Sequence, residues 1–187
     1  MSVSSVFVRY AAAALGLVGM IYAAPVLLGR RPKEVHRLKN VLIAACWVTG
    51  GVVVPLIESN APTVVILWLV IHRLFCIAPD LVAADLVDRR GDIAAGVRDD
   101  VRIHPAHPQR VAVRSLAAAA TLALVAVVSG WSPSGPGGLL LVAIDMLGLA
   151  GTAWTLRGIE RLHHRHVVLL DIWVAFPLVT WLASLCM

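Results

Sequence analysis

Long runs of apolar residues, separated by short polar connections, cover almost the whole chain. Six of these runs are long enough to cross roughly 30 Å of membrane hydrocarbon as helices. They lie near residues 5–28, 40–57, 62–84, 110–131, 137–157 and 167–187. The pattern predicts an all-α fold, in which residues 1–187 form a single polytopic transmembrane domain built as a helix bundle.

The composition agrees with a membrane location. Of the 187 residues, 59% are hydrophobic, and the mean hydropathy is +0.85. These values are too apolar for a soluble domain. Cys46, Cys76 and Cys186 are scattered over different predicted spans. We therefore expect them to be small apolar packing residues, and a disulfide or metal framework is not expected.

Basic residues gather in alternate connections. The second and fourth connections, residues 58–62 and 129–138, contain no positive charge. By the positive-inside rule, the three basic connections face the cytoplasm and both termini lie outside, and the expected location is the bacterial plasma membrane. The pI near 9.7 follows from this orientation, so anionic membrane lipids are expected partners and nucleic acid is not. The basic connections contain Arg30, Arg31, Lys33, Arg37 and Lys39; Arg89, Arg90, Arg98, Arg102 and Arg110; and Arg157, Arg161 and Arg165.

The third connection is the strongest candidate for chemistry. Residues 85–97 read DLVDRRGDIAAGV and are expected to form a loop directly after the third span. At a helix end, Asp85, Asp88 and Asp92 would share one face, because they are spaced at i, i+3 and i+7. Their charges would repel one another unless a cation intervened, and carboxylate oxygens suit Mg²⁺. The alternative is a solvated loop in which arginines such as Arg89 neutralise the aspartates.

The spacing of these acids and glycines resembles a known motif. Asp-x-x-Asp-x-x-Gly-Asp-x-x-Ala-Gly-Val, over residues 85–97, is similar to the second aspartate-rich motif of the UbiA superfamily of intramembrane prenyltransferases. Upstream, YAAP at 22–25, RRPK at 30–33 and RLKN at 37–40 resemble the segment before that family's fifth helix. The likeness covers residues 15 to 130 and implies a bundle like the last six of the family's nine helices.

The resemblance also implies an activity. A UbiA-type enzyme transfers an isoprenyl group from a polyprenyl diphosphate to a lipophilic or aromatic acceptor, with Mg²⁺ as cofactor. Mg²⁺ and cationic side chains stabilise the charge that develops on the departing diphosphate. By resemblance, Asp88 and Asp92 would bind the metal, and Asp85 would act with them. The residues implied to bind the diphosphate are Lys33, Arg37, Lys39 and Arg89.

The sequence also departs from the family. The first aspartate-rich motif is absent from these 187 residues, and RDDVRIHP at 98–105 stands where the family has a Thr-Leu-Pro segment. Three explanations are open: a non-catalytic relative, an enzyme completed by a partner chain or a second copy, or a shortened reading frame. The alternative to a prenyltransferase is therefore a non-catalytic integral membrane subunit that retains the fold.

Three isolated acids, Asp80, Asp145 and Asp171, also fall within predicted spans. Asp145 is expected to line the cavity, or to pair with Arg73 or a hydroxyl group. Charged groups in a membrane are costly and usually face the protein interior. Asp80 is expected either to line a polar path to the active cavity or to pair with Arg73, two helical turns earlier. Asp171 is expected either to reach the membrane interface or to pair with Arg161 or Arg165, and pairing is favoured.

Overall fold

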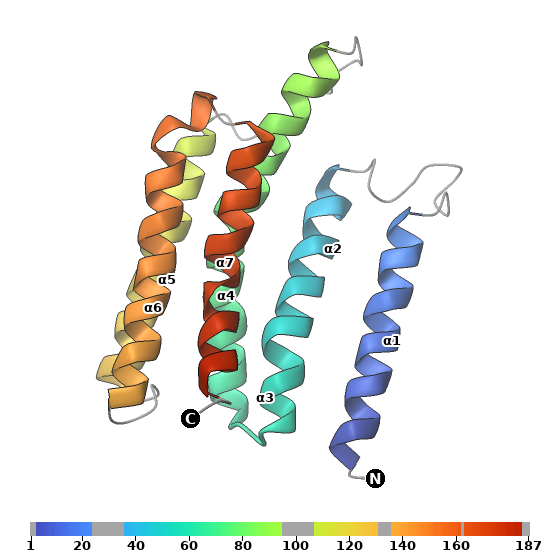
Figure 1. Ribbon diagram of the computed structural model, residues 1–187, viewed down its shortest axis with the longest axis vertical. Helices are drawn as coiled ribbons and strands as arrows, with labels where there is room; N and C mark the ends of the chain where they lie inside the picture. Colours follow the sequence, from blue (N-terminus) through green and yellow to red (C-terminus); the bar gives the residue numbers. More distant parts are fainter. Residues whose placement is uncertain (1–2, 24–35, 95–106, 131–135, 162, 185–187) are drawn as a thin grey trace. The chain divides into compact units, whose positions relative to one another are not determined.

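The computed structural model describes residues 3–23, 36–94, 107–130, 136–161 and 163–184, and all regular structure in these residues is helical. An all-α fold is therefore confirmed for the described part of the chain. Each of the six predicted apolar segments overlaps a helix. In chain order the elements are α1 (Val3–Ala23), α2 (His36–Val48), η2 (Thr49–Val53), α3 (Val54–Glu58), α4 (Thr63–Ala94), α5 (Pro108–Val128), α6 (Pro136–Thr155), η4 (Leu156–Arg161) and α7 (His164–Ser184) (Figure 1).

The chain divides into two compact units, an N-terminal unit of residues 1–74 and a C-terminal unit of residues 75–187. The boundary falls inside α4. In the N-terminal unit, α1 packs against the run formed by α2, η2 and α3. η2 is a π-helical turn, in which the N–H of Val54 donates to the carbonyl of Thr49, five residues earlier. Pro55 follows directly, and the wider turn lets the helix continue past a residue that lacks an N–H.

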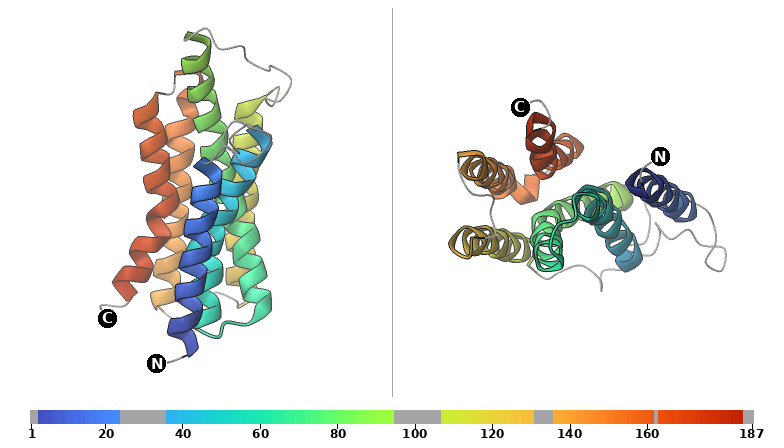
Figure 2. Two further views of the ribbon diagram at one scale, coloured as in Figure 1. Left: turned by 90° about the vertical axis from the view of Figure 1, so that its right-hand side faces the viewer. Right: turned by 90° about the horizontal axis from the view of Figure 1, so that it is seen from below.

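The C-terminal unit gathers the end of α4 with α5, α6 and α7 (Figure 2). Its buried centre joins Ala83 and Val87 of α4, Ala112 of α5, Leu156 of η4 and Leu170 of α7. Small residues recur every three or four positions along α5, so the neighbouring helices can approach it closely. The buried residues of α5 are Ala112, Ser115, Ala119, Ala123 and Ala126.

Glycines mark two of the helix ends in the C-terminal unit. After α5, Gly130 has a φ of +67°, a backbone conformation that glycine adopts without steric cost. Its N–H donates to the carbonyl of Val127 at 3.2 Å, which closes the end of the helix. Between α6 and α7, Gly158 leaves the helical region at φ −107° and ψ 39° and lets the chain turn into the next helix.

Three helical stretches within the described residues are long and apolar enough to cross a membrane: Lys39–Glu58, Thr63–Asp88 and Pro108–Val128. Large apolar side chains remain exposed on the helices of the C-terminal unit, and such a surface is typical of contact with lipid or another partner. These side chains include Val113, Leu124, Leu147, Val168 and Ile172. The structure is therefore compatible with an integral membrane protein.

The acidic segment is helical, so the predicted loop is wrong. α4 continues to Ala94, whereas the sequence predicts a span that ends near residue 84. Hydropathy identifies only the apolar part of this helix. Residues 85–94 contain no proline and several good helix formers, including leucine, alanine and arginine, so the helix extends beyond the apolar run.

Candidate functional site

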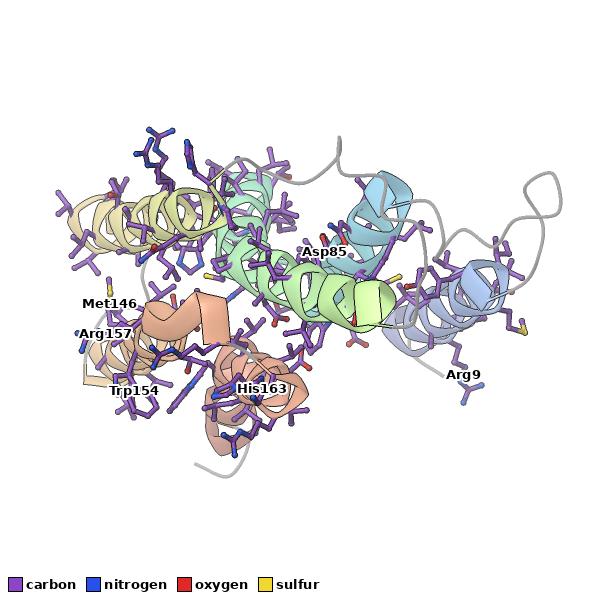
Figure 3. The ribbon with its side chains drawn as sticks, turned by 90° about the horizontal axis from the view of Figure 1, so that it is seen from above. Arg9, Asp85, Met146, Trp154, Arg157 and His163 are labelled. Carbon is purple, nitrogen blue, oxygen red and sulfur yellow. The ribbon has the colours of Figure 1, made fainter. Side chains whose placement is uncertain are left out.

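Asp85 and Asp88 lie one turn apart near the C-terminal end of α4. The expectation that they share a helix face agrees with this geometry, because residues three apart are neighbours on a helix surface. Their environments differ: the Asp85 side chain is 8% exposed, whereas Asp88 is exposed. Figure 3 labels Asp85 on α4. The backbone of Asp92 belongs to the same helix, one further turn along, and its side chain lies outside the described residues.

The predicted diphosphate-binding residues are distributed over both units. Arg37 and Lys39 belong to α2 of the N-terminal unit, and Arg89 belongs to α4 in the C-terminal unit. The Lys39 side chain is half-buried, and the side chains of Arg37 and Arg89 lie outside the described residues. Lys33 falls entirely outside them.

The donor chemistry of α4 fits a magnesium ion. Asp85 and Asp88 offer the hard carboxylate oxygens that Mg²⁺ prefers, and Asp92 would add a third from the next turn. Among the residues whose side chains are described, no three His, Cys, Asp or Glu side chains converge as a ready-made metal site. The described part of the site therefore consists of one buried and one exposed carboxyl group.

A second pair of acids, from helices that are far apart in the sequence, meets within the C-terminal unit. The carboxyl group of Asp80 on α4 lies close enough to that of Asp171 on α7 for the two to interact electrostatically. Asp80 is 7% exposed. Asp171 therefore contacts another carboxyl group instead of Arg161 or Arg165, its predicted partners. The sequence signal for this pair is an acidic residue within each of the apolar segments 62–84 and 167–187.

Basic side chains occupy the end of the C-terminal unit where α5 begins and where η4 leads into α7. At the start of α7, the backbone N–H of His163 donates to Nδ1 of His166 at 3.0 Å, so the His166 side chain stabilises the first helical turn. Figure 3 shows Arg157 and His163 at this end of the unit. The exposed arginines here are Arg110, Arg114, Arg157, Arg161 and Arg165.

Comparisons of the chain with protein-family models, with curated proteins and with solved structures give no match.

Proposed function

We propose that the protein is an integral membrane protein of the UbiA kind, which binds an isoprenyl diphosphate with Mg²⁺ and transfers the isoprenyl group. One observation carries this proposal. Asp85, Asp88 and Asp92 follow one another along α4, beyond an apolar stretch long enough to span a membrane. Carboxylates in that position lie at the membrane boundary, where the diphosphate of a membrane-embedded isoprenoid would also lie.

The residues have distinct proposed roles. Asp88 and Asp92 hold Mg²⁺, and Asp85 supports them from the preceding turn. When bound, Mg²⁺ neutralises negative charge on the diphosphate and makes it a better leaving group. Cationic side chains stabilise the same developing charge, and the apolar helices exclude water from the reacting carbon until a lipophilic or aromatic acceptor attacks it. Arg89, next to Asp88 on the same helix, is the diphosphate-binding cation of this unit, and the roles of Lys33, Arg37 and Lys39 stay predictions from the sequence.

The proposal includes six membrane spans in the bacterial plasma membrane. The basic connections face the cytoplasm, both termini lie outside, and the aspartates of α4 therefore face the cytoplasm. A partner chain or a second copy supplies the acids that correspond to the first aspartate-rich motif of the UbiA family. Membrane lipids surround the helices.

A second candidate function is that of a non-catalytic membrane subunit that retains the helical fold. The burial of Asp85 favours it, because a carboxyl group that is enclosed by its own protein is not accessible to a diphosphate or its metal ion. The two functions differ in one measurable property. Only the first requires Mg²⁺-dependent binding of an isoprenyl diphosphate.

Binding of radiolabelled geranylgeranyl diphosphate to the purified full chain in nanodiscs tests the proposal. We expect Mg²⁺-dependent binding that a chelator abolishes. Replacing Asp88 and Asp92 together by Asn should weaken binding at least about tenfold, or about 1.4 kcal/mol, because two anionic ligands are removed. Glu58→Gln is the control, since Glu58 is an exposed acid in a different connection.

Two results would overturn the binding role. One is wild-type protein that binds the diphosphate equally well with and without Mg²⁺. The other is equal affinity in wild type and in the Asp88/Asp92 double variant. If wild type binds no diphosphate at all under these conditions, the isolated chain is not a prenyltransferase, and the subunit function takes precedence.

A further inference from the structure

Exposed and buried residues lie on opposite sides of α5. Arg110 and Arg114 are exposed, and further exposed residues follow at intervals of three or four, which places all of them on one face of the helix. The opposite face holds the buried residues of α5, which pack within the C-terminal unit. The outward face of α5 consists of Arg110, Arg114, Ala117, Thr121, Leu124 and Val128.

The outward face changes from charged to apolar along its length. Its two arginines lie in the first two turns, and α5 contains no acidic residue. Further along, Leu124 is 58% exposed and Val128 is 87% exposed. The hydroxyl group of Thr121 donates to the carbonyl of Ala117 at 2.9 Å, so its hydrogen bond is made within the helix. The outward face therefore has a cationic end and an apolar remainder, a division that phospholipids share.

The position of Arg114 indicates that the cationic end has a partner outside the helix. The stretch Pro108–Val128 is long and apolar enough to cross a membrane, and Arg114 follows Pro108 by six residues, or ~9 Å of helix rise. A charged side chain at that depth is costly in lipid, even if its long stem lets the guanidinium reach toward the interface. The arginines also gain nothing from the helix dipole, because its N-terminal end is positive. An anion offsets these costs.

A phosphate group attached to an acyl chain fits the outward face in chemistry and in length. Guanidinium and phosphate groups form strong charge-assisted hydrogen bonds, and two arginines one turn apart can contact the same phosphate. From Arg114 to Leu124 the helix rises by ~15 Å, which is about half of the ~30 Å hydrocarbon core. The apolar part of the face is therefore as long as the acyl chains of one leaflet.

We propose that the outward face of α5 binds an anionic phospholipid. The phosphate contacts Arg110 and Arg114, and an acyl chain lies along the face toward Leu124. This inference rests on the proposed membrane location, and it is independent of the diphosphate chemistry, whose aspartates lie on α4. The lipid belongs to the leaflet on the side of the basic connections, where anionic headgroups attract cationic side chains.

A second pair of arginines provides a matched control. Arg157 and Arg161 are also exposed, are also four residues apart, and belong to the same unit. They lie on η4, a six-residue 3-10 segment, in which residues four apart do not share a face because a turn takes three residues. Replacing either pair removes the same charge, so a difference between the two double variants reports the outward face of α5.

Native mass spectrometry of the full chain in detergent micelles, with phosphatidylglycerol or phosphatidylcholine added, tests the site. We expect wild type to bind phosphatidylglycerol in preference to phosphatidylcholine. Arg110→Gln/Arg114→Gln should weaken binding of phosphatidylglycerol about tenfold or more, because both charge-assisted contacts to the phosphate are lost. Arg157→Gln/Arg161→Gln should weaken it less than about threefold, because only the general attraction to the anion changes.

Two results overturn the proposal. One is equal binding of the two lipids by wild type, and this comparison decides the matter even if both double variants fail to fold. The other is equal weakening by the two double variants, which would mean that the anionic lipid is attracted to the basic end of the unit as a whole and has no site on α5.

The same measurements distinguish a phospholipid from other occupants of this face. Inorganic phosphate, added at the same concentration as the lipid, should displace little phosphatidylglycerol because it has no acyl chain. Full displacement would identify a site for free anions and overturn the lipid assignment. If Arg110→Gln/Arg114→Gln converted a dimer into a monomer and left lipid binding unchanged, the face would hold a second copy of the chain, and the proposal would also be overturned.

Discussion

The close packing of α6 against α7 predicts that a side chain at position 151, now Gly151, would destabilise the protein. A Cβ atom added there would lie 2.5 Å from Cδ2 and Cε2 of Trp173 and 2.8 Å from its Cε3. These carbons belong to the body of the indole ring on α7, so the ring cannot yield as the tip of a flexible side chain would. The missing side chain at Gly151 is therefore what allows the two helices to approach this closely.

Two opposing effects determine how much Gly151→Ala changes the free energy of unfolding. Alanine is favoured over glycine in a helix interior by about 1 kcal/mol. Forcing an extra methyl group into a packed interface costs about 1–3 kcal/mol. A matched control separates the two effects: Gly19 lies inside α1, and a Cβ added there meets nothing within 4 Å. Gly151→Ala should therefore be about 1–3 kcal/mol less stable than Gly19→Ala.

Reversible unfolding of the full chain in mixed detergent micelles, followed by circular dichroism, measures the free energies of unfolding. A double-mutant cycle with Trp173→Ala then assigns the cause. With the indole ring removed, the alanine at position 151 should cost little or become favourable. Equal stability of Gly151→Ala and Gly19→Ala would refute the close contact. A cost that is unchanged in the Trp173→Ala background would refute its assignment to this ring.

Two further predictions concern the centre of the bundle and its orientation. Leu170→Ala should lower the free energy of unfolding by about 2–5 kcal/mol because it leaves a cavity in the apolar cluster. Val168→Ala, at a position 58% exposed, should change this free energy little. Equal losses in the two variants would contradict the buried cluster. The orientation can be tested with single cysteines in a cysteine-free background and a thiol reagent that does not cross the membrane. Ser59→Cys should react in intact cells, whereas Arg157→Cys should react only after permeabilisation. The reverse pattern would overturn the orientation from the positive-inside rule.

The apolar pattern predicted where helices occur better than where they end. Each predicted segment overlaps a helix because a long apolar run has few stable alternatives to a helix. The end of α4 was misplaced because hydropathy measures preference for an apolar environment, whereas a helix continues wherever backbone hydrogen bonds and side-chain propensities allow it. The chain past Asp85 is polar but still helical, ending at Ala94.

The partner of Asp80 could not be predicted from local sequence. Helical periodicity relates Asp80 only to residues on its own helix, such as Arg73, two turns earlier. The observed contact, Asp171, lies on a helix that follows two intervening helices, and its position depends on how those helices pack. Local reasoning likewise assigned Asp171 to the nearest arginines on its own segment. Contacts between distant helices are set by the shapes of their buried faces.

The acids of α4 show why spacing alone cannot assign a role to a carboxyl group. Asp85 and Asp88 are neighbours on the helix surface, yet one is buried and the other exposed, because burial depends on what packs against each position. A charged ligand that arrives from water meets Asp88 first, and it can reach Asp85 only if that buried group is uncovered. Asp80, earlier on the same helix, is buried beside the carboxyl group of Asp171. The proposed diphosphate chemistry therefore depends most on Asp88.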